Sequence, residues 1–151
     1  MANTQAMCTS FKGELLVGHH NFGTGVVRAA TTADSFKAAL YLASATINAA
    51  TTAYTATGEA SGTNYTAGGV AVTNATAPAT SGTTAYWTPS ASITYTNVTL
   101  STAFDCVLIY NSTQSNKAVS VHTFGSQTVT AGTFTLTMPT NDSSTGLIRL
   151  A

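Results

Sequence analysis

The chain has 151 residues, and its five basic and five acidic side chains give a formal net charge of zero, with charged residues at only 7% of the sequence. A nucleic-acid-binding protein needs a basic surplus, and a transmembrane helix needs about 18 consecutive apolar residues, whereas the longest dense apolar run here is Cys106–Tyr110. We therefore expect one domain over residues 1–151 with neither nucleic acid nor a membrane as a partner.

The N-terminal half contains short stretches in which apolar and polar residues alternate, the period of a β-strand with one buried face. Residues 1–10 are polar and are expected to form a flexible arm. The strands expected after it are Ser10–Val17, Val26–Ala29, Ser35–Leu42, Gly69–Thr73 and Thr83–Trp87. Between them, Ala43–Asn64 fits either a long ordered loop or a loop with one helical turn near Thr46–Ala53, and Asn74–Gly82 is a second loose stretch.

The C-terminal half has the stronger strand signals. Phe104–Asn111 is apolar on both faces, which is typical of a central strand. Before it, the alternation changes phase at Asn97, which indicates a β-bulge. The strands expected in this half are Ser92–Leu100, Phe104–Asn111, Lys117–Phe124, Gln127–Thr130, Thr133–Met138 and Gly146–Leu150. Ala131-Gly132 is expected to be a two-residue hairpin connection, and Pro139 ends the strand that follows it.

Eight to ten short strands at turn-rich spacing predict an all-β protein, a jelly-roll-like antiparallel β-sandwich. Its core is expected to be lean, because Val, Ile, Leu and Phe together number 29, against 31 Thr, 25 Ala and 14 Ser. Association of copies would bury further apolar surface, so we expect a homodimer or homotrimer. Cys8 and Cys106 could pair, although nothing in the local sequence demands it, and Cys106 is expected to be buried.

No group of residues in the sequence has the spacing of a catalytic, cofactor or metal site, so we expect no enzyme activity, no cofactor and no metal. His19 and His20 are adjacent and would point to opposite sides of an extended chain, which favours an exposed loop over a metal site. Asp105, in the central strand, is expected to be a buried, hydrogen-bonded residue. His122 alternates with inward-facing valines and is expected to face outward or toward a partner.

Three aromatic residues leave a carbohydrate-binding alternative open. Tyr86, Trp87 and Tyr95 could form a flat, exposed platform of the kind on which sugars stack. The other interpretation, which we favour, places Trp87 in the core beside Pro89.

Two long segments resemble small structural proteins of tailed bacteriophages, nearest to the head decoration, or cement, proteins of short-tailed phages. The first is DSFKAALYLASATINAATTAYTATGEASGTNYTAGG, residues 34–69, and the second is FDCVLIYNSTQSNKAVSVHTFGSQTVTAGTFTLTMP, residues 104–139. The resemblance implies a jelly-roll-like sandwich without a cofactor that associates symmetrically on the outside of a phage capsid. It supplies no functional motif whose residues could be carried over.

The implied function is that of a virion structural protein, made in the host cytoplasm, that binds the major capsid protein at the capsid surface and stabilises the shell. The alternative is a receptor- or carbohydrate-binding β-sandwich protein of a head fibre or the tail. From the residues themselves, Leu147, Ile148 and Leu150 would leave an apolar tail exposed unless it is docked, so we expect them at an interface.

Overall fold

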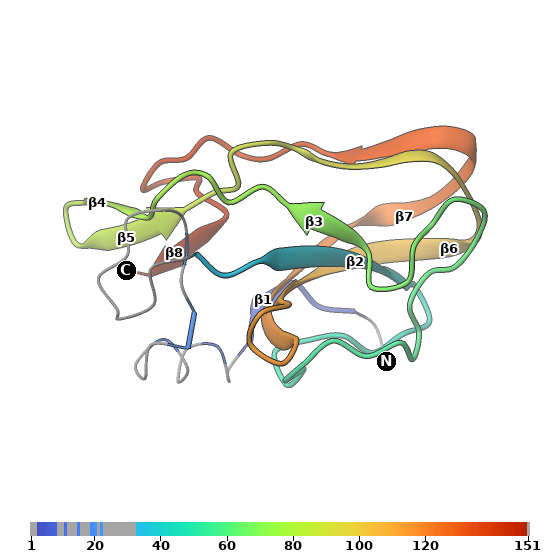
Figure 1. Cartoon of the computed structure of the whole chain (residues 1–151), viewed down its shortest axis with the longest axis horizontal. Coiled ribbons are helices and arrows are strands. Elements are labelled where there is room, and N and C mark those ends of the chain that lie inside the picture. Colours follow the sequence, from blue (N-terminus) through green and yellow to red (C-terminus); the bar gives the residue numbers. More distant parts are fainter. Residues whose placement is uncertain are drawn as a thin grey trace.

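The computed structural model describes residues 3–8, 11, 15, 19, 20, 22 and 33–150. These residues form two antiparallel sheets that pack as a β-sandwich, which confirms the predicted all-β, jelly-roll-like fold (Figure 1). The larger sheet has the strand order β1-β7-β6-β2-β3, and the smaller has the order β4-β5-β8. The strands are β1 (Ala6–Met7), β2 (Phe36–Leu42), β3 (Val70–Val72), β4 (Ala79–Ser81), β5 (Thr84–Trp87), β6 (Ile93–Asn111), β7 (Lys117–Leu136) and β8 (Ile148–Leu150).

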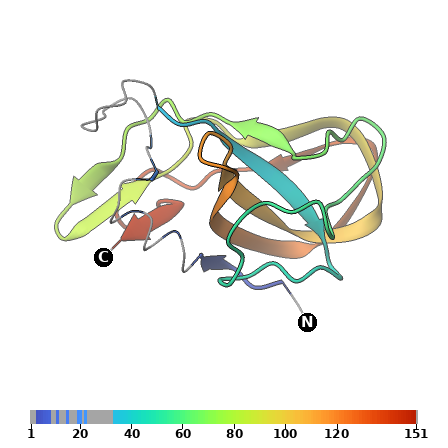
Figure 2. The same cartoon turned by 60° about the horizontal axis from the view of Figure 1, so that its bottom comes forward.

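The hairpin of β6 and β7 contributes to both layers of the sandwich. β6 has 19 residues and β7 has 20, and their pairing shifts register several times between Tyr95 and Cys106. Figures 1 and 2 show the hairpin bending back at one end, so that its outer half, residues 93–100 with 127–136, lies over its inner half, residues 104–111 with 117–123. β-Bulges bend and twist a strand, so a bulged hairpin can cover its own apolar face.

The prediction of a hairpin turn at Ala131-Gly132 is wrong. Both residues lie within β7, where Gly132 pairs with Val98, and the strands predicted on either side of them are parts of one continuous strand. Ala131 has a φ of 45° and Asn97, nearby on β6, has a φ of 52°, so the bulge predicted at Asn97 is confirmed by the register shift between Tyr95 and Val98. A small residue followed by Gly supports a turn or a bulge equally well, and only the partner strand decides between them.

Most of the remaining strand predictions are confirmed, since β2, β3, β5 and β8 lie where alternation placed them. β4 was missed, and residues 43–64 form an ordered loop without the helical turn. Of the strand predicted over Ser10–Val17, Phe11 and Leu15 are described and have helical backbone; Val26–Ala29 lies outside the described residues. Within the part of the chain that the structure describes, no helix has the length and hydropathy needed to cross a membrane.

The inner half of the hairpin is buried on both faces, as the sequence predicts for a central strand. Val107 and Ile109 face the outer half, while Cys106, Leu108 and Tyr110 face the opposite way, and all are at most 3% exposed. Tyr95 reaches from the outer half to donate a hydrogen bond to the Ala38 carbonyl oxygen on β2, at 2.9 Å. This buried bond fixes the spacing of the two layers.

The loop over residues 43–68 covers the other face of the inner half. The Tyr54 and Tyr110 rings stack at 4.9 Å, and the Tyr110 hydroxyl donates to the Gly68 carbonyl at 2.7 Å. Gly69 continues the chain with a φ of 72°, and a Cβ there would lie 1.7 Å from the Ala38 carbonyl oxygen, so only glycine allows this approach to β2. A loop rich in Ala and Thr thus becomes a fixed lid on the sheet.

Residues 3–8 of the expected N-terminal arm are docked. Ala6 and Met7 pair with Val121 and Ser120 on β7. The Asn3 side chain donates to the Leu42 carbonyl at 3.0 Å and to the Asp105 carboxylate at 2.6 Å. The described part of the arm is therefore a short edge strand held by hydrogen bonds at both ends.

Candidate functional site

An apolar groove opens between the two halves of the bent hairpin. It has a volume of about 290 Å³. Its apolar lining comes from both halves and from the segment that follows β7, and the residues are Ile93, Val107, Ile109, Phe124, Phe134, Leu136, Met138 and Leu147. The polar side chains at its wall include His122 and Gln127. Because apolar surface in a groove gains stability when it is covered, this is a candidate contact surface.

The outer edge of β7 borders this groove. β1 pairs with that edge only at Ser120 and Val121, and within the described residues no strand pairs with the outer side of residues 124–136. Residues 124–138 contain no charged side chain. Thr128, Thr130, Thr133 and Thr135 in this stretch are exposed, and Thr135 also borders the groove. A long uncharged edge is unusual, because natural sheets usually block their edges with charges, proline or short strands.

His122 lies at the groove, on the face of the sheet opposite Val121. The residue is half-buried and lines the groove, on the other side of the strand from the inward-facing valines as alternation predicts. Its Nε2 atom lies 2.9 Å from the Ser120 hydroxyl, and burial lowers its pKa from 6.5 to about 4, so the ring is neutral near pH 7. A neutral imidazole can exchange one hydrogen bond with serine and otherwise acts as an apolar wall of the groove.

The three predicted interface residues occupy different environments. Leu147 lines the groove, and Leu150 is 40% exposed. Ile148 is only 6% exposed, because it pairs with Trp87 across β5 and β8 and belongs to the core. The prediction is therefore corrected for Ile148, because the C-terminal strand is docked. Leu147 lies just before this strand, and Leu150 lies at its end.

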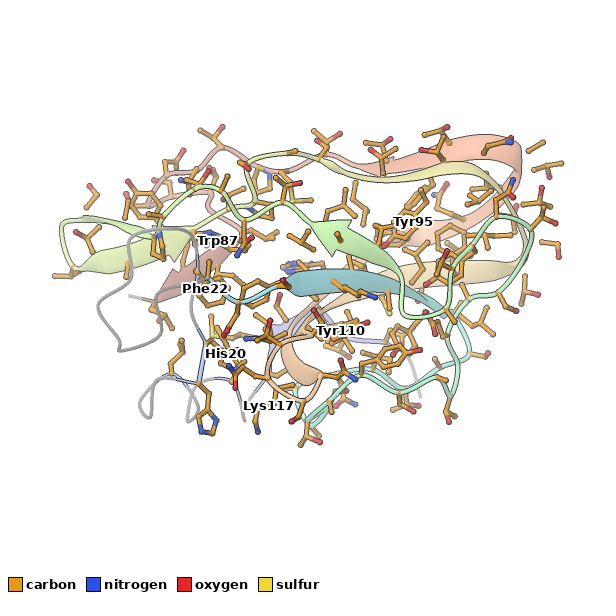
Figure 3. The ribbon with its side chains drawn as sticks, in the orientation of Figure 1. His20, Phe22, Trp87, Tyr95, Tyr110 and Lys117 are labelled. Atoms are coloured by element: carbon orange, nitrogen blue, oxygen red, sulfur yellow. The ribbon has the colours of Figure 1, made fainter. Side chains whose placement is uncertain are left out.

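The predicted aromatic platform does not exist, because Trp87 and Tyr95 are 2% and 1% exposed. Figure 3 shows Trp87 beside Phe22, and the two ring centroids are 4.8 Å apart. Trp87 also packs against Phe36, with ring centroids at 6.1 Å, and its indole N–H donates to the Thr76 carbonyl at 2.9 Å. The core interpretation of Trp87 is thus confirmed.

A buried polar cluster joins the start of β2 to the end of β6. The Asn111 amide lies 2.8 Å from the Asp34 carboxylate and 3.2 Å from Nδ1 of His20, and all three residues are at most 8% exposed. The exposed loop predicted for His20 is therefore wrong, while His19 is half-buried. Asn111 also accepts hydrogen bonds from the Thr113 and Gln114 backbone amides, so the cluster fixes the β6–β7 turn.

A second cluster surrounds Glu59 at the edge of β2. Its carboxylate accepts hydrogen bonds from the Tyr54 hydroxyl at 2.6 Å, the Tyr65 hydroxyl at 2.9 Å and the Gly68 amide at 2.7 Å. Burial, and then the hydrogen bond to Glu59, raise the pKa of Tyr54 to about 12. The Tyr65 hydroxyl also accepts from the Leu40 amide, so the cluster replaces a neighbouring strand at this edge.

We expect Glu59→Gln to lower the free energy of unfolding by about 1–3 kcal/mol. Both carboxylate oxygens of Glu59 accept hydrogen bonds, whereas the NH2 group of glutamine can only donate, so at least one of the three bonds is lost. Urea unfolding measures the change, with Thr57→Gln, an exposed position in the same loop, as the control that should stay near wild type. An unaltered unfolding midpoint in Glu59→Gln would show that the cluster does not hold the loop.

The remaining candidate residues are Asp105, Cys8 and Cys106. The hydrogen bond predicted for Asp105 is confirmed, because its carboxylate accepts from Asn3, but the side chain is half-buried and the predicted burial is wrong. Cys8 and Cys106 are both buried and form no disulfide with each other, so the burial predicted for Cys106 is confirmed. Among the described residues there is no cluster of three or more His, Cys, Asp or Glu side chains placed to hold a metal ion.

Comparison of the chain with protein-family models, with curated proteins and with solved structures finds no significant match. The site therefore has to be interpreted from its own geometry. Sequence reasoning missed the groove and the open edge of β7, although one signal was present. The 15 residues of 124–138 carry no charge to block pairing, and from Thr128 onward Thr recurs beside apolar residues.

Proposed function

We propose that this chain is a structural protein of a bacteriophage virion, and specifically a decoration protein that binds the major capsid protein on the outside of the shell and stabilises it. The resemblance of residues 34–69 and 104–139 to such proteins is the first support. The observation that carries the proposal is the low charge of the chain, 7% of its residues, which suits a surface that is covered by other proteins. The apolar groove beside an uncharged strand edge adds a surface for association between copies.

The surface chemistry fits attachment to a lattice of subunits. With 7% charged residues, the molecule can be covered by neighbours without removing many ions from water. Each contact with a capsid subunit can be modest, because many copies on a closed shell act together. The packaged genome exerts pressure on the shell and so strains the seams between subunits. A decoration protein bridges those seams and adds buried area there.

The receptor- or carbohydrate-binding alternative loses its specific support, because the rings that would form a sugar platform are in the core. The decoration function places the chain in the virion, at the capsid surface, after synthesis in the host cytoplasm.

Deleting the gene is expected to give particles that form but release their DNA at lower temperature or under milder osmotic shock than wild-type particles. The measurement is DNA release against temperature, with cryo-EM of both particles to locate the lost density. Adding back the purified protein should restore the wild-type release temperature. Particles of unchanged stability that no longer adsorb to cells would contradict the proposal and favour the receptor-binding alternative.

A further inference from the structure

We propose that the outer edge of β7 is a homodimer interface, in which two copies of the chain pair antiparallel about a two-fold axis at Ala131-Gly132. The proposal deepens the self-association expected for the proposed function. It concerns the contact between copies alone, so it can be tested on purified protein without a virus particle.

The open edge is the first observation. Residues 127–136 of β7 pair with β6 on one side and, among the described residues, have no strand on the other. The backbone groups of such an edge are a template for a further strand. With no charge in residues 124–138, two copies approach without electrostatic repulsion and without desolvating an ion.

The second observation is that this edge is complementary to itself. On both sides of Ala131-Gly132 the sequence has the same order, Thr-Val-Thr before and Thr-Phe-Thr after. Thr128, Thr130, Thr133 and Thr135 are all exposed, whereas Val129 and Phe134 are half-buried on the opposite face. In a regular strand, Thr130 and Thr133 would point to opposite faces, because they are three residues apart. The bulge changes the phase of alternation between the two triplets, so the Thr side chains of both triplets share one face.

A two-fold axis at the bulge therefore matches side chains of one kind. Thr128 lies opposite Thr135 of the second copy, and Thr130 lies opposite Thr133 of the second copy, all on the solvent face. Val129 lies opposite Phe134 of the second copy, on the groove face. The molecule already contains this kind of contact between its own strands, where the Thr94 and Thr135 hydroxyls lie 3.5 Å apart. Directly opposite pairs of this kind stabilise antiparallel sheets.

The groove is covered in the same arrangement. Gln127 and Leu136 both line the groove, and they face each other across the axis. The outer halves of the two hairpins join into one sheet, and the mouths of the two grooves meet beneath it. A second copy is favoured over an unrelated extended segment as the partner of this edge. The order of residues around Ala131-Gly132 is self-complementary, and this property matters only when the same edge pairs with itself. In a dimer of this symmetry each copy contributes the same edge, so neither β7 edge remains open to a third copy.

Sedimentation velocity of the full-length protein over a range of concentrations is expected to show a monomer–dimer equilibrium. Thr130→Lys/Thr133→Lys places like charges opposite each other twice across the axis, so the dimer dissociation constant should rise about tenfold or more. Thr130→Glu/Thr133→Lys places opposite charges in the same positions and should keep the dimer. Thr80→Lys/Ser81→Lys, on exposed positions of β4, controls for added charge and should also keep it.

Circular dichroism and the urea midpoint show whether each variant is folded, and the Glu/Lys variant tests the register even if the Lys/Lys variant is unstable. A monomeric wild-type protein, or a trimer, would overturn the proposal. So would a dimer that the Lys/Lys variant weakens no more than the β4 control does, or a Glu/Lys variant that is folded and monomeric.

Discussion

Replacing Trp87 by alanine is expected to lower the free energy of unfolding by about 3–5 kcal/mol. Trp87 is among the largest fully buried side chains, packs against Phe22 and Phe36, and its hydrogen bond to Thr76 is lost in the variant. A domain of this size is stabilised by only about 5–15 kcal/mol in total. Because the core is lean, the variant should be close to unfolded at growth temperature.

Urea unfolding followed by circular dichroism measures this loss, since the variant has no tryptophan for fluorescence. Tyr86→Ala is the matched control, because Tyr86 is the neighbouring residue of β5 but is only half-buried and points to the other side. Its expected cost is about 1 kcal/mol. Trp87→Phe keeps an aromatic ring and should fall between the two. Equal losses in Trp87→Ala and Tyr86→Ala would contradict the placement of Trp87 in the core.

The local order of apolar and polar residues was enough to predict those elements whose buried faces can be recognised from their own sequence. Cys106–Tyr110, in the strand predicted over Phe104–Asn111, is apolar at successive positions, and such a run is stable only in the middle of a sheet with both faces covered. The change of phase at Asn97 similarly predicts a bulge. The apolar residues before and after Asn97 would point to opposite faces of a regular strand, and a bulge lets both sets face the core. These features need no knowledge of distant residues.

The parts that the sequence did not predict depend on contacts between distant residues. Whether Ala131-Gly132 turns the chain or forms a bulge depends on β6, more than thirty residues away. The groove exists because the β6–β7 hairpin bends, and the bend results from several register shifts along the pair. His20 is buried because Asn111 offers it a hydrogen-bond partner. No local pattern reports such partners.

The stability of the protein is expected to fall as the pH decreases from about 6.5 to about 4, through His122. The pKa of His122 is about 4 in the folded chain, because burial disfavours the imidazolium ion, against 6.5 for an ordinary histidine. Between these values the unfolded chain binds a proton that the folded chain does not, so protonation favours unfolding. The contribution of His122 is fully present above the higher value, and up to about 3 kcal/mol is lost below the lower one.

His122→Gln isolates this contribution, because glutamine keeps a polar side chain of similar size at the groove but does not titrate in this range. Between about pH 7.5 and about pH 4.5, the wild-type protein should lose about 2.5 kcal/mol more than the variant, measured by urea unfolding at one fixed protein concentration. Gln127→Ala also changes the groove but leaves His122 in place, so its pH dependence should follow the wild type. Carboxylates contribute equally to all three proteins. If His122→Gln and the wild type lose the same free energy, then the ring accepts a proton without leaving the fold, and the groove is wetter than its apolar lining indicates.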